Sequence, residues 1–164
     1  MTVQETEMTS GTLMMVTFDI AGGLDLYDIR NVFSGLYDLF TWASYREHPS
    51  RFDKSIVPLH PLDVTPNVRR VSYNSPLEVV LAINGGIAAV ALTANRILAM
   101  WDRLQLTRTR HTGEALTRLA LDIMREELEV LRGRDKLTRP DERALAERAA
   151  WVLSNISELK VEER

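Results

Sequence analysis

The longest uncharged stretch of the chain constrains its fold more than any other feature of the sequence. Residues 76–101 read PLEVVLAINGGIAAVALTANRILAMW, and no charged residue lies between Glu78 and Arg96. A transmembrane helix needs about 20 predominantly apolar residues. The uncharged run is shorter than this, and the Asn-Gly-Gly sequence at 84–86 disfavours a continuous helix through it. We therefore predict a strand that turns at the paired glycines into a buried helix.

Two interpretations of this stretch lead to different functions. In the first, residues 79–83 form a strand that is covered on both faces, and residues 87–104 form a helix. That helix is expected to bury Ala89, Val90, Leu92, Ile97 and Met100 and to expose Arg96, Asp102 and Arg103. In the second, residues 79–101 associate with an inner membrane, because Trp101 and the arginines after it suit a membrane boundary with a basic cytoplasmic flank.

Composition places the chain among ordinary globular proteins. Its 164 residues suffice for one domain, and the apolar and charged fractions of 45% and 26% argue against wholesale disorder. The net charge of −3 gives no general attraction to nucleic acid, so we expect no nucleic-acid partner. The chain has no cysteine, and its first residues are polar and acidic, unlike a secretory signal. We therefore expect a cytoplasmic protein.

The first half of the chain is expected to form a small sheet. Residues 13–20 read LMMVTFDI, which is rich in β-forming residues. Residues 25–45 then place apolar side chains at helical spacing. Two β-type runs at 68–73 and 77–83 flank an Asn-Ser-Pro turn, which predicts an antiparallel hairpin, with a single bent strand as the alternative. We expect a mostly antiparallel β-α-β-β arrangement that is covered by the 25–45 helix.

The second half of the chain is expected to be helical. Residues 114–132 carry an amphipathic pattern, and Pro140 favours the start of a further helix at 139–160. The apolar residues of this further helix follow helical spacing and are Leu145, Ala149, Val152, Ile156 and Leu159. Such a seam suits packing along another helix, so we expect an antiparallel hairpin of 114–132 with 139–160. Residues 106–113 are expected to connect this hairpin to the preceding helix, and the alternative interpretation is the solvated middle of one very long helix.

These elements predict an α+β fold with three parts. Residues 1–12 form a tail, residues 13–105 form an α+β core, and residues 106–164 form a helical C-terminal half. The helical half is either part of the same domain or an appended hairpin.

Candidate interaction residues lie on two of the predicted helices. Aromatic side chains dominate the hot spots of protein interfaces, so Trp42 and Tyr45, near the end of the 25–45 helix, are candidate contact residues. A position in the domain core is the alternative interpretation for Trp42. The seam residues Leu145, Val152, Ile156 and Leu159 are candidates for self-association of the C-terminal helices.

The irregular stretch 46–67 carries the candidate metal ligands. Its prolines interrupt helix and strand, and a loop of this length in a compact domain is usually functional or mobile. The ligand types for zinc or iron, imidazole and carboxylate, occur at His48, Asp53, His60 and Asp63. Their spacing matches no helical ligand pair, so a polar surface loop is the alternative interpretation.

The sequence contains no motif for a cofactor or for a catalytic nucleophile. The patterns G-x-G-x-x-G, G-x-x-x-x-G-K-[ST] and G-x-S-x-G are all missing. We therefore predict no bound cofactor and name no catalytic residue.

The segment RVSYNSPLEVVL, at residues 70–81, resembles a strand signature of the form SYxSPLE(I/V)VL. This signature is found in small uncharacterised proteins of actinobacteria and their phages. In that group a short strand and helix start precede the signature, and long Arg- and Glu-rich helices follow it. The resemblance implies a similar order of elements and is consistent with a phage-encoded protein, but it implies no activity and carries over no site residue.

The sequence as a whole favours a non-enzymatic protein-interaction or assembly protein. We expect it to self-associate, or to bind another protein, through the helices at 114–132 and 139–160. The first alternative is a membrane-associated effector or adaptor that uses residues 79–101. The second alternative is a small metal-dependent enzyme that uses the 46–67 loop.

Overall fold

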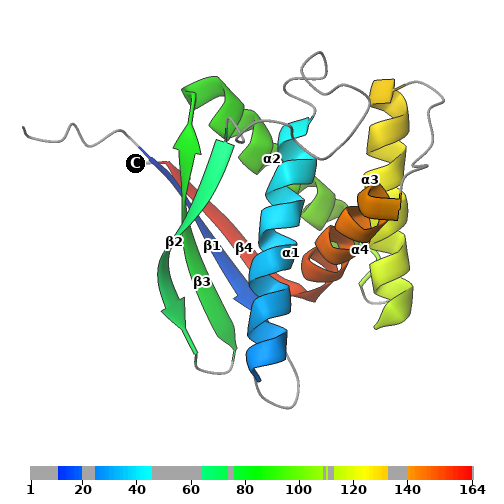
Figure 1. The fold of residues 1–164 in the computed structure, drawn as a ribbon, viewed down its shortest axis with the longest axis horizontal. Coiled ribbons are helices and arrows are strands. Elements are labelled where there is room, and N and C mark those ends of the chain that lie inside the picture. The colour runs from blue at the N-terminus through cyan, green and yellow to red at the C-terminus, as the bar shows by residue number, and fades with distance from the viewer. Residues whose placement is uncertain are drawn as a thin grey trace, which may run out of the picture.

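A computed structural model describes residues 11–19, 25–45, 64–73, 76–108, 110, 113–132 and 140–163. In these residues the chain has an α+β fold with a four-stranded antiparallel sheet and four helices (Figure 1). The elements follow in the order β1 (Thr12–Phe18), α1 (Leu26–Tyr45), β2 (Val64–Ser72), β3 (Leu77–Gly85), α2 (Ile87–Gln105), α3 (Glu114–Arg132), α4 (Pro140–Asn155) and β4 (Ile156–Glu163).

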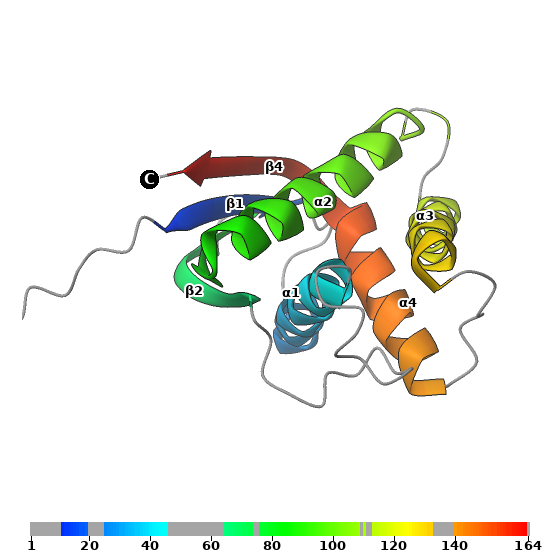
Figure 2. The same ribbon diagram turned by 90° about the horizontal axis from the view of Figure 1, so that it is seen from above.

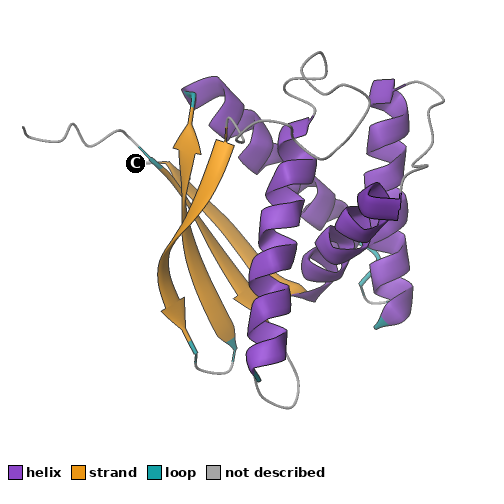
Figure 3. Cartoon of the chain, in the orientation of Figure 1, coloured by secondary structure: helices purple, strands orange, loops and turns teal. Residues whose placement is uncertain are grey.

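The strands lie in the order β2-β3-β1-β4, and each neighbouring pair is antiparallel. Figures 1 and 3 show all four described helices on one side of this sheet. Figure 2 shows α2 running across the strands and α4 lying between α1 and α3. Helix α3 packs on α4 and α2 and is the outermost element of the helical layer. The predicted hairpin of β2 with β3 is confirmed.

The alternation of side chains along β1 explains why one sheet face is covered. Met14, Val16 and Phe18 point to one side and are fully buried, whereas the residues between them are only half-buried. Successive side chains of a strand point to opposite faces, so the three buried residues define the face that the helices cover. Strand β3 is apolar in both phases, as expected for a central strand.

The uncharged stretch bends at its paired glycines, as the sequence predicts. Strand β3 ends at Gly85, which has a φ angle of 153° that favours glycine, and Gly86 precedes the first turn of α2. Among the described residues, no helix combines the length and apolar character that a bilayer crossing requires. The predicted set of buried residues in α2 is wrong in part, because Arg96 is buried at 7% exposure and Leu92 is 54% exposed. Thr93 and Ala94 take the buried positions next to Val90.

The predicted helix at 139–160 is wrong in its last turn. The predicted helical hairpin is matched in part, because α3 and α4 pack together but α4 also packs against α1. Helix α4 ends at Asn155, and the next residues form β4, which pairs with β1 at the edge of the sheet. In this pairing Phe18 lies opposite Ile156, whereas Thr17 lies opposite Glu158. The extra residue, Ser157, forms a bulge that shifts the alternation by one position. Ile156 and Leu159 therefore face the same side although they are three residues apart.

Side chains from α2 and the turn after it hold the junction between α4 and β4. The indole Nε1 of Trp101 donates a hydrogen bond of 3.0 Å to the carbonyl of Ile156, and Arg108 donates one of 2.9 Å to the carbonyl of Ser154. The side-chain amide of Asn155 donates a hydrogen bond of 2.7 Å to the carbonyl of Trp151. The last carbonyl groups of a helix have no partner within it, so these donors stabilise the point where the helix ends.

Candidate functional site

Five of the six interaction residues predicted from the sequence lie in the core of the protein, namely Trp42, Leu145, Val152, Ile156 and Leu159. The side chain of Tyr45 lies outside the described part of the structure. Helix α4 packs against both α1 and α3, so its seam is covered within the chain. The seam of α4 is therefore not accessible to a partner protein.

The predicted metal ligands His48, Asp53, His60 and Asp63 lie outside the described residues. Within the residues that the structure does describe, no group of three or more histidine, cysteine, aspartate or glutamate side chains is arranged to hold a metal ion.

One candidate site is a cavity between α1 and α4, with a volume of about 600 Å³. The first turns of α1 contribute Tyr27, Asp28 and Asn31 to its lining, and α4 contributes Ala144, Glu147, Arg148 and Trp151. Asp25 fixes the start of α1, because its carboxylate accepts a hydrogen bond of 2.8 Å from the amide of Asp28. The cavity therefore brings together residues from two distant segments of the chain.

A second cavity, of about 720 Å³, lies on the other side of the same helix, between α3 and α4. Glu147 and Trp151 line both cavities and form a ridge between them, which we call the α4 ridge. On the α3 side the hydroxyl groups of Thr117 and Ser154 lie 2.9 Å apart. Arg118 is paired only loosely with Glu114, at 3.9 Å, and both side chains are highly exposed.

A partly buried ion pair lies where α1 crosses α4. Arg148 donates from Nε to the carboxylate of Asp38 at 2.5 Å, and the Asp38 side chain is largely buried. Burial raises the pKa of Asp38 above its ordinary value, although the hydrogen bond and the charge of Arg148 act in the opposite direction. The guanidinium of Arg148 borders the α1–α4 cavity, but its charge is engaged by Asp38.

The other candidate site is the sheet face that points away from the helices, which we call the open face. The strand register shows which side chains share it, since residues opposite each other in antiparallel strands point to the same side. Its centre is apolar and consists of Leu13, Met15, Val80 and Ala82. Its margins are polar and consist of Asn67, Arg70 and Ser72 on β2, Glu78 on β3, Thr17 on β1, and Glu158, Lys160 and Glu162 on β4.

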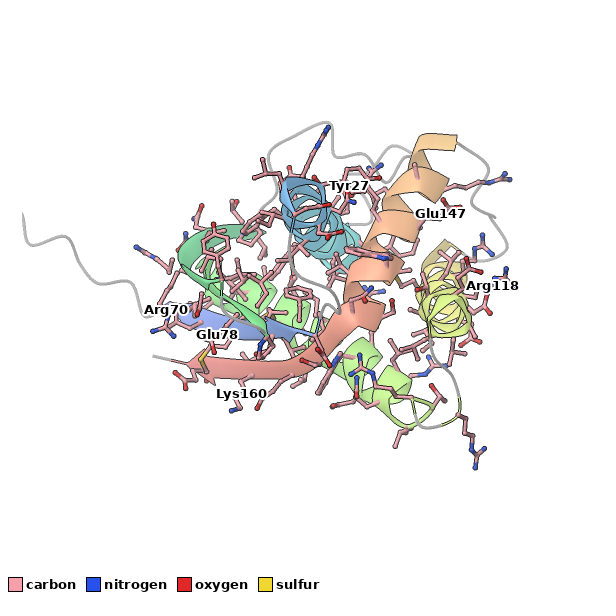
Figure 4. The ribbon with its side chains drawn as sticks, turned by 90° about the horizontal axis from the view of Figure 1, so that it is seen from below. Tyr27, Arg70, Glu78, Arg118, Glu147 and Lys160 are labelled. Atoms are coloured by element: carbon pink, nitrogen blue, oxygen red, sulfur yellow. The ribbon has the colours of Figure 1, made fainter. Side chains whose placement is uncertain are left out.

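Ion pairs border the apolar centre of the open face on both sides. Arg70 contacts Glu78 across the β2–β3 pair at 2.8 Å, and Lys160 contacts Glu158 along β4 at 2.8 Å. Figure 4 shows Arg70, Glu78 and Lys160 on the strands and Tyr27 and Glu147 on the helices, so the two candidate sites are separate. The hydrogen bond that the Lys160 ammonium donates to the Glu158 carboxylate raises the pKa of Lys160.

Comparison with protein-family models, curated proteins and solved structures finds no match to this chain. The resemblance of residues 70–81 to the actinobacterial and phage signature therefore stays a prediction. The assignment of function rests on the geometry of the two candidate sites.

The sequence pattern did not reveal either site, although one signal was present. The alternation along β1 left Leu13, Met15 and Thr17 on the face opposite the buried one. A sheet with helices on one side only leaves such a face open. The α1–α4 cavity had no comparable signal, because Tyr27 and Glu147 come together only when the two helices pack.

Proposed function

We propose that this protein is a non-enzymatic interaction protein that self-associates by stacking two copies at the open face. The observation that carries the proposal is an apolar centre with charged margins on a sheet face that no described helix covers. Leu13 and Met15 are half-buried there and supply the accessible apolar surface, whereas Val80 and Ala82 beside them are buried at 8% and 5% exposure. A protein surface of this kind, apolar in the centre and polar at the rim, is typical of an interface.

The edges of the sheet are less suited to a partner than its face. Strand β2 contains Pro66, and its register slips by one residue between Val68 and Arg70. Strand β4 presents charged residues at alternate positions from Glu158 to Glu162. Proline, bulges and charges on edge strands are features that oppose pairing with a further strand. These features favour stacking on the open face over extension of the sheet.

The distribution of charge favours a second copy of the chain as the occupant. Strand β2, at one edge, carries Arg69 and Arg70, whereas β4, at the other edge, carries three glutamates and one lysine between Glu158 and Glu163. Most homodimers have two-fold symmetry. A two-fold axis along the strands would place β2 of one copy over β4 of the other. The basic edge would then meet the acidic edge twice, and the apolar centre would meet itself.

Substitution of Met15 by lysine tests this proposal. Sedimentation velocity or light scattering over a range of concentrations should show a dimer for the natural chain and a monomer for Met15→Lys, with unchanged circular dichroism. The matched control is Leu92→Lys, because Leu92 is exposed on α2, on the helical side of the sheet. A natural chain that stays monomeric at all concentrations, or a Met15→Lys variant that still dimerises, would overturn the proposal.

A charge reversal tests the orientation of the two copies. The strand register places Arg70 and Lys160 at the same level on opposite edges, so the proposed axis brings Arg70 of one copy over Lys160 of the other. Lys160→Glu should therefore strengthen the dimer by about tenfold, which corresponds to about 1.4 kcal/mol, because a like-charge contact becomes an opposite-charge contact. A Lys160→Glu dimer that is no stronger than that of the natural chain, while Met15→Lys still gives a monomer, would reject the orientation and leave the face.

A further inference from the structure

We propose that the α1–α4 cavity binds an arginine or lysine side chain within an exposed segment of a partner protein. The cavity combines two aromatic side chains, Tyr27 and Trp151, with two carboxylates, Asp28 and Glu147. This site lies on the helices and is separate from the open face, so the inference does not depend on self-association (Figure 4).

The aromatic rings supply the first reason to expect a cation. Tyr27 is 69% exposed at the start of α1, and Trp151 is half-buried on α4, where it packs against the core. The face of an aromatic ring attracts a cation, and tryptophan and tyrosine are the most effective rings for this purpose. Trp151 is held by its packing, which leaves little side-chain entropy to be lost when a guest is bound.

The balance of charge supplies the second reason. Among the described residues, no ion pair involves Asp28 or Glu147, whereas the one cation that lines the cavity, Arg148, is engaged by Asp38. The cavity therefore presents two negative charges that none of the described residues neutralises there. A guanidinium or ammonium group between the two helices would contact a carboxylate from each helix.

The size of the cavity favours a peptide segment over a small free cation. Its volume of about 600 Å³ lies in the range of sites for ligands that are much larger than one ammonium group. Asn31 and the carboxylates provide hydrogen-bonding groups for the peptide backbone next to the basic side chain. A basic residue and its neighbours in an extended segment would fill this space.

The test uses two peptides that differ in one group. Acetyl-Gly-Ala-Arg-Ala-Gly-amide is titrated into the full chain while tryptophan fluorescence and amide chemical shifts are recorded, and a second peptide carries citrulline in place of arginine. The arginine peptide should bind in the α1–α4 cavity, and the neutral citrulline peptide should bind at least about tenfold more weakly. Free arginine should bind more weakly than the peptide. Equal binding of the two peptides, no binding of either, or equal binding of free arginine would overturn the inference.

Variants at the cavity wall give an independent readout with matched controls. Tyr27→Ala and Glu147→Gln should each lower the affinity for the arginine peptide by roughly threefold to fivefold. Both positions are exposed, so the fold should tolerate the changes. The controls are Tyr37→Ala, an exposed tyrosine of α1 that does not line the cavity, and Asp122→Asn, an exposed carboxylate of α3. The peptide binds elsewhere if the control variants lose affinity for it, or if Tyr27→Ala and Glu147→Gln keep the affinity of the natural chain.

Discussion

Gly35 of α1 lies so close to Val152 of α4 that a methyl group added at Gly35 would come within 2.0 Å of Val152 Cγ2 and within 3.1 Å of the carbonyl oxygen of Arg148. This close approach sets the distance between the two helices that form the α1–α4 cavity. We predict that Gly35→Ala lowers the free energy of unfolding by about 1–3 kcal/mol, because an overpacked contact forces neighbouring groups to shift. Urea unfolding followed by circular dichroism measures this change.

Gly86 provides the control for this substitution. A methyl group at Gly86 would have no heavy atom within 4 Å, and the residue has a φ angle of −60°, which alanine adopts without strain. Gly86→Ala should change stability by less than about 1 kcal/mol, because the lower entropy of the unfolded chain is opposed by the poor preference for alanine at the N-cap. Equal losses in both variants would contradict the close packing at Gly35.

The buried carboxyl of Asp38 predicts a dependence of stability on pH. Its pKa is raised in the folded protein by burial, against the opposing effect of Arg148. Just above pH 3.8, the folded protein therefore keeps a proton on Asp38 that the unfolded chain releases, so the contribution of this group to stability falls as the pH rises through that range. The difference in unfolding free energy between the natural chain and Asp38→Asn should therefore decrease as the pH rises above about 3.8.

Arg148 provides the test of the cause. Arg148→Met removes the cation that holds the pKa of Asp38 down, while burial persists. The pH range over which Asp38 reduces stability should then extend to higher pH. A pH profile that is identical in Asp38→Asn, Arg148→Met and the natural chain would show that this ion pair does not control the acid range.

The first half of the fold was predictable because its signals are local. The Asn-Ser-Pro turn between two β-type runs and the paired glycines after β3 each act within a few residues. The errors in the predicted buried residues of α2 have a different origin. Thr93 and Arg96 are buried because α2 crosses the sheet and packs against α1, and the number of surfaces that a helix contacts is not encoded in its own spacing.

Strand β4 was missed because a bulge imitates helical spacing. Ile156 and Leu159 are three residues apart, like two residues on one face of a helix, but the bulge at Ser157 brings them to the same face of a strand. The side chain of Ser157 also donates to the carbonyl of Thr17 at 3.1 Å, which supports the bulge. Only the alternation of Leu159, Lys160 and Val161 pointed to a strand.

The candidate sites were less predictable than the fold because they depend on packing between distant segments. The apolar seam of α4 was read as a surface, but α1 and α3 cover it from two sides. The ring of Tyr27 and the carboxylate of Glu147 line one cavity only because α1 and α4 cross at Gly35. Spacing along one helix predicts an apolar face, but it does not reveal which element covers that face.

The hydrogen bond from Trp101 to Ile156 predicts a further effect on stability. Trp101→Phe removes the donor and leaves the carbonyl of a buried residue without this partner. We expect a loss of about 1–3 kcal/mol in the free energy of unfolding. Tyr73→Phe, which removes a hydroxyl group from an exposed ring, should have no measurable effect. A Trp101→Phe variant as stable as Tyr73→Phe would show that other groups hold the junction.

Removal of residues 156–164 distinguishes an edge strand from the last turn of a helix. If the segment only extended α4, its loss would fray one helix end at little cost. In the structure it forms β4, whose Ile156 and Leu159 are buried against the core, so its removal also uncovers Val16 and Phe18 of β1. Loss of two buried aliphatic side chains alone should cost about 3–6 kcal/mol, a large part of the stability of a domain.

The shortened chain should therefore melt at a much lower temperature or aggregate, whereas a chain that ends at Val161 should keep most of its stability. Matching melting curves for both shortened chains would contradict the role of β4.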